Sequence, residues 1–228
     1  MTNATEPDWS AIHTLFLDMD GTLLDLHFDN YFWQEHVPQR YAEINELEIE
    51  RARELLYPRF QAAEGTMEWY CVDYWSQELG LDIAMLKEEV DHLIAIHPHV
   101  VDFLEALERS GRRRVLVTNA HQKSLALKME KTQLAGHFEK IICTHDFGKP
   151  KEETSFWDAL QAVEPFEPAS TLLIDDSLPV LRSAHSYGIK HLLAVRNPDT
   201  RGAARDTADF TALDHFESLL ELAERSPA

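Results

Sequence analysis

The sequence has few cysteines and no long hydrophobic run. Only two cysteines, Cys71 and Cys143, occur among its 228 residues, which does not indicate a disulfide-stabilised secreted domain. No apolar stretch approaches the roughly 20 residues that cross a membrane. Residues 1–9 are polar and acidic and lack the basic start and apolar core of a signal peptide. We therefore expect a cytoplasmic protein with reduced thiols and no membrane partner.

Basic residues are also scarce. The chain has 40 Asp and Glu against 21 Lys and Arg, a formal net charge of −19. Such a surface repels nucleic acid polymers and anionic membranes. It also repels an anionic substrate at long range, so a phosphate site would need local positive charge, which a bound metal would supply. The 44% hydrophobic content is that of a globular protein, and the length predicts one large domain or a core with an insertion.

What the sequence does contain is a series of apolar, strand-like segments. They cover residues 15–17, 114–117, 140–143, 171–174 and 191–195. Helical patterns are found over residues 124–131, 152–163, 179–187 and 214–225. Strands that alternate with helices predict an α/β fold with a Rossmann-like parallel sheet. In such a sheet the functional site lies beyond the carboxyl ends of the strands.

Residues 26–97 have a different character. They contain no Val- and Ile-rich strand, many aromatic residues, and two acidic, helix-compatible blocks over 40–60 and 81–96. Gly65 and Thr66 indicate a bend, and Pro98 marks the end of the segment. We predict an all-helical cap over residues 26–97, inserted after the first strand into a core formed by residues 1–25 and 98–228.

Two acids follow the first strand directly. Asp18 and Asp20 are two residues apart, so in an extended chain both side chains point the same way. Acids at the end of a buried strand are costly unless a cation or a reaction needs them. Two further acids, Asp175 and Asp176, follow the strand at 171–174. Asp18 with one or both of them would suit Mg²⁺, which prefers a few carboxylates plus water and substrate oxygens.

The other groups that phosphate-ester hydrolysis requires also follow strands. Asp20 is placed to act as the general acid and base. The hydroxyl of Thr118, the amide of Asn119 and backbone N–H groups near Gly21 are candidate donors to phosphate oxygens. Lys151 opens a helix on the same rim and would offset charge in the transition state; Lys149 is less well placed. Taken alone, each motif is also typical of a turn or a helix cap, but together and in order they favour catalysis.

These segments resemble the four motifs of the haloacid dehalogenase (HAD) superfamily of phosphatases over about residues 12–200. The sequences DLHFDNYFW at 25–33 and WYCVDYW at 69–75 further resemble the bacterial GMP/IMP 5′-nucleotidase subgroup. The resemblance implies that Asp18 forms an aspartyl-phosphate and that Asp20 is the acid and base. It also implies that Asp18, the backbone carbonyl of Asp20, Asp175 and Asp176 are Mg²⁺ ligands. Mn²⁺ or Co²⁺ could replace Mg²⁺ in an oxygen-ligand site.

The cap is expected to select the substrate. Trp69, Tyr70 and Tyr74 are candidates to stack on a purine; the alternative is that they pack the cap's own core. His121 lies on the active rim and is a further candidate contact. We expect a Mg²⁺-dependent phosphomonoesterase of GMP and IMP, acting as a monomer or small homo-oligomer. The alternatives are a phosphatase of sugar phosphates or FMN, a phosphomutase, or a catalytically silent phosphate-binding module.

Overall fold

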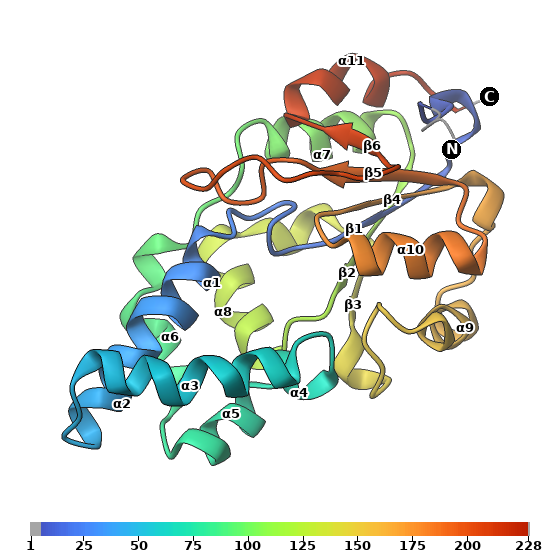
Figure 1. Ribbon diagram of the computed structural model, residues 1–228. Helices are drawn as coiled ribbons and strands as arrows, with labels where there is room; N and C mark the ends of the chain where they lie inside the picture. Colours follow the sequence, from blue (N-terminus) through green and yellow to red (C-terminus); the bar gives the residue numbers. More distant parts are fainter. Residues whose placement is uncertain (1–5, 228) are drawn as a thin grey trace.

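A single six-stranded sheet forms the centre of the protein, as a computed structural model that describes residues 6–227 shows (Figure 1). Every pair of neighbouring strands is parallel, in the order β3-β2-β1-β4-β5-β6. The strands are β1 (Thr14–Leu17), β2 (Arg113–Thr118), β3 (Lys140–Cys143), β4 (Thr171–Asp175), β5 (His191–Val195) and β6 (Thr211–Leu213). The predicted α/β fold with a parallel sheet is confirmed. Residues 1–5 and 228 of the predicted core range lie outside the described residues.

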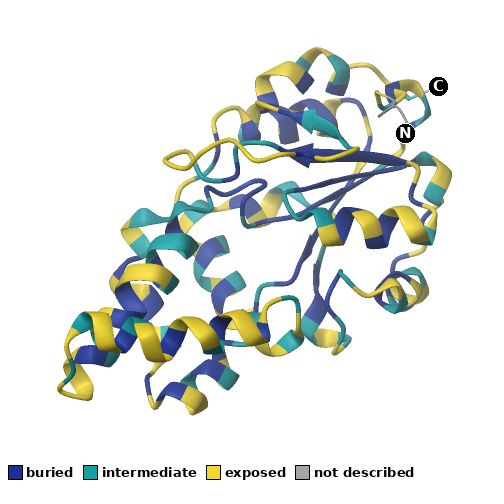
Figure 2. Ribbon diagram, in the orientation of Figure 1, coloured by how far each residue is buried: buried dark blue, intermediate teal, exposed yellow. Residues whose placement is uncertain are grey.

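The central strands of the sheet are buried on both faces, as their dark colour in Figure 2 shows, whereas the short edge strand β6 is only partly buried. Along β1, Leu15 and Leu17 belong to one hydrophobic cluster and Phe16 to the other, because side chains alternate between the faces of a strand. The first cluster includes residues of α7 (Val100–Arg109), α8 (Gln122–Thr132) and α11 (Leu220–Ala223). The second includes residues of α9 (Thr154–Val163) and α10 (Leu178–Tyr187). Parallel strands covered on both faces are accordingly almost entirely apolar.

Six helices are inserted between β1 and α7, on the carboxyl side of the sheet (Figure 1). They are α1 (His27–Tyr31), α2 (Val37–Ile44), α3 (Ile49–Ala63), α4 (Met67–Tyr70), α5 (Val72–Leu79) and α6 (Ile83–Glu89), with a π-helical segment over Phe32–His36 and a 3₁₀ turn over Asp91–Leu93. The insertion has a hydrophobic core of its own, which includes Phe32, Leu56 and Trp75. The predicted all-helical insertion after the first strand is confirmed.

The two connections between the insertion and the sheet lie against each other. Leu24 on the way out forms an antiparallel bridge with Ile96 on the way back. The amide of Asp25 donates to the carbonyl of Ala95 (2.9 Å), and the amide of His97 donates to the carbonyl of Leu23 (2.9 Å). The insertion therefore joins the core through one narrow, hydrogen-bonded pair of segments.

Several predicted boundaries were wrong. The block over 40–60 is not one helix, since residues 45–48 separate α2 from α3 and Glu46 has a positive φ of 53°. The block over 81–96 ends its α-helix at Glu89. The pattern over 214–225 becomes a 3₁₀ turn at Phe216–Leu219 followed by the short α11. Strand β6 and helix α7 were not predicted: β6 has only three residues, whereas the residues of α7 do have helical spacing.

The register of the central strands sets the position of the site. Leu17 is paired with Leu116 on one side and with Ile174 on the other. The amide of Asp18 continues the ladder by donating to the carbonyl of Ile174 (3.1 Å). The residues one step beyond these pairs, which include Asp18 and Asp175, therefore lie together at the carboxyl edge of the sheet.

Candidate active site

Lys151 is the central cation of the candidate site. Its side chain is buried, and Nζ donates to Asp18 Oδ1 (2.5 Å), to Asp175 Oδ2 (2.7 Å) and to the backbone carbonyl of Val117 (3.0 Å). Burial alone would lower the pKa of Lys151, but the two carboxylates outweigh it and raise that pKa. The lysine is thus firmly charged. Burial raises the pKa of Asp18 to about 6 despite this contact.

Three carboxylates form a candidate metal site beside this lysine. Asp18, Asp175 and Asp176 each offer an oxygen, and these oxygens all lie within 4.8 Å of one another. Burial raises the pKa of Asp175 and, helped by the neighbouring acids, raises that of Asp176 well above its usual value. Mg²⁺ binds hard oxygen donors, and it would relieve the repulsion between these buried carboxylates. The residues present therefore fit a Mg²⁺ ion.

Gly21 allows the loop after β1 to approach Asp176 closely. Its φ is +83°, and a Cβ atom at this position would lie 2.7 Å from the carboxylate carbon of Asp176. Any side chain would therefore collide with a candidate metal ligand and would also strain the backbone. This close approach gives a physical reason for the glycine that follows Asp20.

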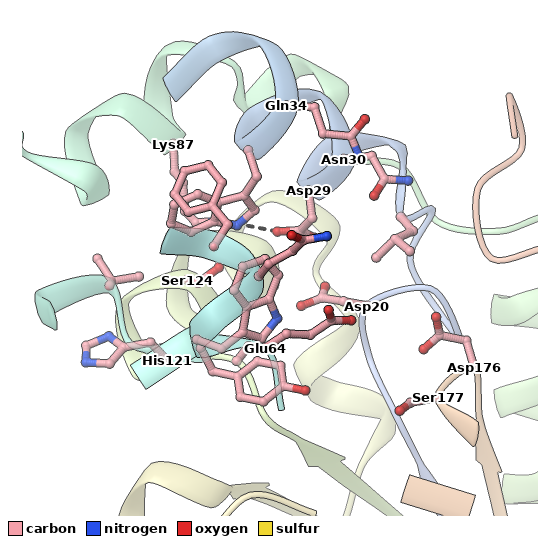
Figure 3. Close-up of a pocket in the computed structure, with 18 of the residues that line it drawn as sticks. Asp20, Asp29, Asn30, Gln34, Glu64, Lys87, His121, Ser124, Asp176 and Ser177 are labelled. Atoms are coloured by element: carbon pink, nitrogen blue, oxygen red, sulfur yellow. Dashed lines mark hydrogen bonds and ion pairs between the residues drawn. The ribbon is translucent and has the colours of Figure 1, made fainter. Parts of the chain in front are cut away.

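Asp20 is held by a second buried lysine. Nζ of Lys128 donates to Asp20 Oδ1 (2.6 Å) and to Asp29 Oδ2 (2.7 Å), and Lys87 donates to the other oxygen of Asp29 (3.1 Å). Burial raises the pKa of Asp20 to about 6. Burial acts in the same direction on Asp29, but its two lysines outweigh it and lower that pKa to about 2. Figure 3 shows the carboxylates of Asp20 and Asp176 directed towards the same space.

The predicted phosphate donors are already engaged in hydrogen bonds. The hydroxyl of Thr118 accepts from the amide of Ala120 (3.0 Å). The side chain of Asn119 accepts from the Lys151 amide (2.9 Å) and donates to Glu152 (2.9 Å). Asn119 thus fixes the start of the segment that carries Lys151. That Thr118, Asn119 and the backbone of Gly21 bind phosphate stays a prediction.

A cavity of about 850 Å³ lies between the inserted helices and the strand ends. The residues that line it include two acids, Asp20 and Asp176, and three of the predicted substrate contacts, Trp69, Tyr70 and His121. Burial lowers the pKa of His121, which favours its neutral form at pH 7. Tyr74 does not line this cavity and packs edge-on against Trp75, with ring centroids 5.1 Å apart. Further lining residues that the sequence did not single out are Asn30, Trp33, Gln34, Lys87, Ser124 and Arg205.

The insertion also contacts the core at the site through Glu152. Tyr70 on α4 donates its hydroxyl to one oxygen of Glu152 (2.5 Å), and Asn119 occupies the other oxygen. Arg205, from the loop between β5 and β6, donates to Asp176 (2.9 Å). The sequence motifs at the strand ends did not identify Glu152, Arg205 or Lys128. The sequence carries no signal for the burial of Lys128, because its partners Asp20 and Asp29 are about a hundred residues away.

Comparison with known proteins agrees with this geometry. The model of the haloacid dehalogenase-like hydrolase family matches residues 15–194. The chain belongs to this family, and it is a hydrolase of the phosphatase type. It is 40% identical over 212 residues to the GMP/IMP nucleotidase YrfG of Escherichia coli K12, covering 93% of this chain and 96% of that protein.

Solved structures share the fold. A HAD phosphatase from Thermococcus onnurineus has a TM-score of 0.78 at 20% identity, over 95% of this chain and 100% of that one. The HAD-hydrolase YfnB of Bacillus subtilis, solved bound to magnesium, has a TM-score of 0.61 at 18% identity, over 93% and 98% of the two chains. Among the described residues of our protein, none of the helices has the length and apolar character needed to cross a membrane.

Proposed function

We propose that this protein is a Mg²⁺-dependent 5′-nucleotidase that hydrolyses purine nucleoside monophosphates, with GMP and IMP as its preferred substrates. The observation that carries the phosphatase chemistry is the buried cluster of Asp18, Lys151 and Asp175, with Asp20 facing a cavity large enough for a nucleotide. The purine preference is supported by the 40% identity to a GMP/IMP nucleotidase along nearly the whole chain.

The proposed reaction has two steps. A carboxylate oxygen of Asp18 attacks phosphorus, the bond from phosphorus to the nucleoside oxygen breaks, and that oxygen takes a proton from Asp20. Asp20 then removes a proton from water, which attacks the aspartyl-phosphate and releases inorganic phosphate and free Asp18. Lys151 offsets negative charge in both steps. Mg²⁺, held by Asp18, the Asp20 carbonyl and the acids at 175 and 176, would neutralise phosphate oxygens.

A pKa of about 6 for Asp20 suits both halves of this cycle. A general acid and base works best when its pKa is near the operating pH, because it must give a proton in one step and take one in the next. Burial is the cause of the raised pKa, and Lys128 limits the rise. An ordinary exposed Asp, with a pKa of about 3.9, would be almost fully ionised at pH 7 and would rarely hold a proton to donate.

The cavity offers both apolar and polar contacts to a purine. Trp33, Trp69 and Tyr70 provide aromatic surface against which a base can stack. Guanine and hypoxanthine share an acceptor at O6 and a donor at N1. The amides of Asn30 and Gln34, which also line the cavity, can supply both partners of that edge. Adenine has the reversed edge, so the amides distinguish it only where they are held in one orientation. The bond from Asn30 Nδ2 to Asp199 (2.7 Å) holds Asn30 in this way and leaves its oxygen as the acceptor.

The test is turnover of a phosphate-ester panel with Mg²⁺, comparing the wild type with Asp18→Asn. We expect GMP and IMP to exceed AMP, sugar phosphates and FMN in kcat/KM, and the variant to lose at least about 10³-fold. Phosphate release by Asp18→Asn at the wild-type rate would exclude the proposed nucleophile. Equal or better turnover of sugar phosphates or FMN would exclude the nucleotide assignment while leaving the phosphatase chemistry in place.

We also propose that the enzyme works in the cytoplasm. Cys71 and Cys143 are both free thiols, and burial raises the pKa of Cys143 to about 11. A pair of free cysteines is ordinary in a reducing compartment.

A further inference from the structure

A second group of metal-ligating side chains lies where the inserted helices meet the sheet. Cys71, His121 and His145 each offer one ligand atom, and these atoms all lie within 4.8 Å of one another. Cys71 joins α4 to α5 in the insertion, His121 precedes α8 after β2, and His145 lies in the 3₁₀ turn Thr144–Asp146 after β3. Three segments from both parts of the molecule therefore bring one sulfur and two imidazoles together.

His145 is arranged as a metal ligand would be. Its Nε2 atom is buried and has no hydrogen-bond partner among the described residues. A neutral imidazole with its proton on Nδ1 presents a lone pair at Nε2, which a metal ion could accept. A buried ring nitrogen without a partner is otherwise a cost to the fold.

His121 and Asp73 complete the surroundings. The ring of His121 lies edge-on to that of His145, with centroids 4.9 Å apart. Asp73, two residues after Cys71, places a carboxylate oxygen 3.7 Å from Nε2 of His121 and also binds Lys123 (2.6 Å). A metal on Nε2 would put the ring proton on Nδ1, so the 3.3 Å bond that Nδ1 accepts from the Lys123 amide would be given up. That bond is long and therefore weak.

We propose that Cys71, His121 and His145 bind a transition-metal ion of the Zn²⁺ class, with Asp73 available as a fourth ligand. A thiolate with two imidazoles is a donor set for zinc rather than for magnesium, so this site and the carboxylate site select different ions. Tetrahedral zinc places N and S ligands about 3.3–3.6 Å apart, given bond lengths of about 2.0 Å and 2.3 Å. Side-chain rotations that close the group by roughly an ångström would meet this requirement.

The position of the site predicts its effect. Cys71 and Asp73 come from the insertion and the two histidines from the core. An ion bound by both would hold the insertion in the arrangement of this structure, in which it contacts the core and which is here called closed. Tyr70, the neighbour of Cys71, already contacts Glu152 of the core. A ligand that binds only the closed form shifts the population towards it. Since nucleotide entry and product release need the cavity to open, zinc should slow turnover.

The binding test uses Co²⁺ as a spectroscopic probe in excess Mg²⁺, which keeps the carboxylate site filled. We expect a thiolate-to-cobalt charge-transfer band and the visible bands of tetrahedral Co²⁺ in the wild type. Cys71→Ser should lose the charge-transfer band, and His145→Ala should lose the tetrahedral bands. Cys143→Ser, which removes the other thiol, should keep both. Absence of the bands in the wild type, or their survival in Cys71→Ser, would overturn the site.

The effect on closure is tested by turnover in saturating Mg²⁺ with and without added Zn²⁺. Zinc should lower kcat of the wild type and of Cys143→Ser and leave Cys71→Ser unaffected. Equal inhibition of Cys71→Ser would overturn the role in closure, because zinc would then be acting elsewhere. The cobalt spectrum needs no substrate, so a failure of the nucleotidase assignment would leave the metal-binding result intact. Likewise, absence of the cobalt bands would leave the result of the substrate panel intact.

Discussion

Two buried lysines each hold one of the two acids that follow β1. Lys151 contacts Asp18 and Asp175, whereas Lys128 contacts Asp20 and Asp29. The first acid is thereby turned towards the candidate metal ligands and the second towards the inserted helices. Burial raises the pKa of both acids to about 6. Their different roles in the proposed reaction thus follow from their different neighbours and not from a difference in pKa.

Lys128 is expected to be a positioning residue for Asp20, and Lys128→Met tests this. The change leaves the largely buried carboxylate of Asp20 without a partner and leaves Asp29 with Lys87 alone. It should lower the free energy of unfolding by about 3–5 kcal/mol. Because Lys128 lowers the pKa of Asp20, its loss should move the limb of the pH–rate profile that reports Asp20 to higher pH. Urea unfolding and kcat/KM measured against pH give the two readouts.

Lys131→Met is the matched control, since Lys131 lies three residues further along the chain and makes a half-exposed pair with Asp91 (2.8 Å). That pair should contribute less than about 1 kcal/mol, and its loss should leave the pH profile in place. A pH profile of Lys128→Met that overlays the wild type would show that Lys128 does not act on Asp20.

Among the elements, the start of β2 is tied to both ends of the chain through Arg112. This buried guanidinium donates to the carbonyls of Trp9 (2.8 Å), Ile12 (3.0 Å) and Ala223 (2.9 Å). Trp9 begins the 3₁₀ turn Trp9–Ala11 before β1, Ile12 follows that turn, and Ala223 ends α11. One side chain therefore satisfies carbonyls of two segments that are far apart in the sequence.

Arg112→Met should destabilise the fold by about 3 kcal/mol, because it leaves buried carbonyls without donors. Arg109→Met removes an exposed arginine that pairs with Glu105 and Glu224 and should cost less than about 1 kcal/mol. The measurement is the urea midpoint of each variant. Equal midpoints for the two variants would contradict a structural role for Arg112.

On the scale of the whole molecule, acidic residues outnumber basic ones, with 40 Asp and Glu against 21 Lys and Arg. The formal net charge of −19 leaves a general repulsion that every ion pair of the folded surface must act against. The cations of the candidate site, Lys151, Lys128, Lys87 and Arg205, are all paired with carboxylates. Net positive charge for a phosphate would therefore come from the metal bound there. Substrate attraction is therefore a short-range property of the site.

Added salt should consequently stabilise the protein at pH 7. Raising NaCl from about 10 mM to about 150 mM shortens the Debye length from about 30 Å to about 8 Å and screens the net repulsion. We expect a gain of about 1 kcal/mol, or about 2–4 °C in Tm, measured in EDTA with KCl as a second salt. The gain should shrink at pH 5, near the sequence pI of 4.9. A Tm that falls with salt at pH 7 would mean that ion pairs dominate.

The sequence could predict whatever depends on local pattern and on strand order. Continuous apolar runs predicted five of the six strands, and parallel strands necessarily bring their carboxyl ends to one edge. From the sequence alone we therefore expect Asp18, Lys151 and Asp175 to lie together, and they do. Strand β6 was missed because three residues, of which only Leu213 is buried, carry no pattern.

The tertiary structure decided which distant side chains meet. Lys128 reaches Asp20 across 108 positions and Asp29 across 99, and Cys71 reaches the two histidines only because α5 packs near the loops after β2 and β3. No periodicity encodes such contacts, since they depend on how the inserted helices settle on the core. The sequence by itself therefore determined the family and which polar side chains meet at the strand ends. The packing of the insertion decided how Asp20 is held, what lines the cavity and where the proposed ion of the Zn²⁺ class would bind.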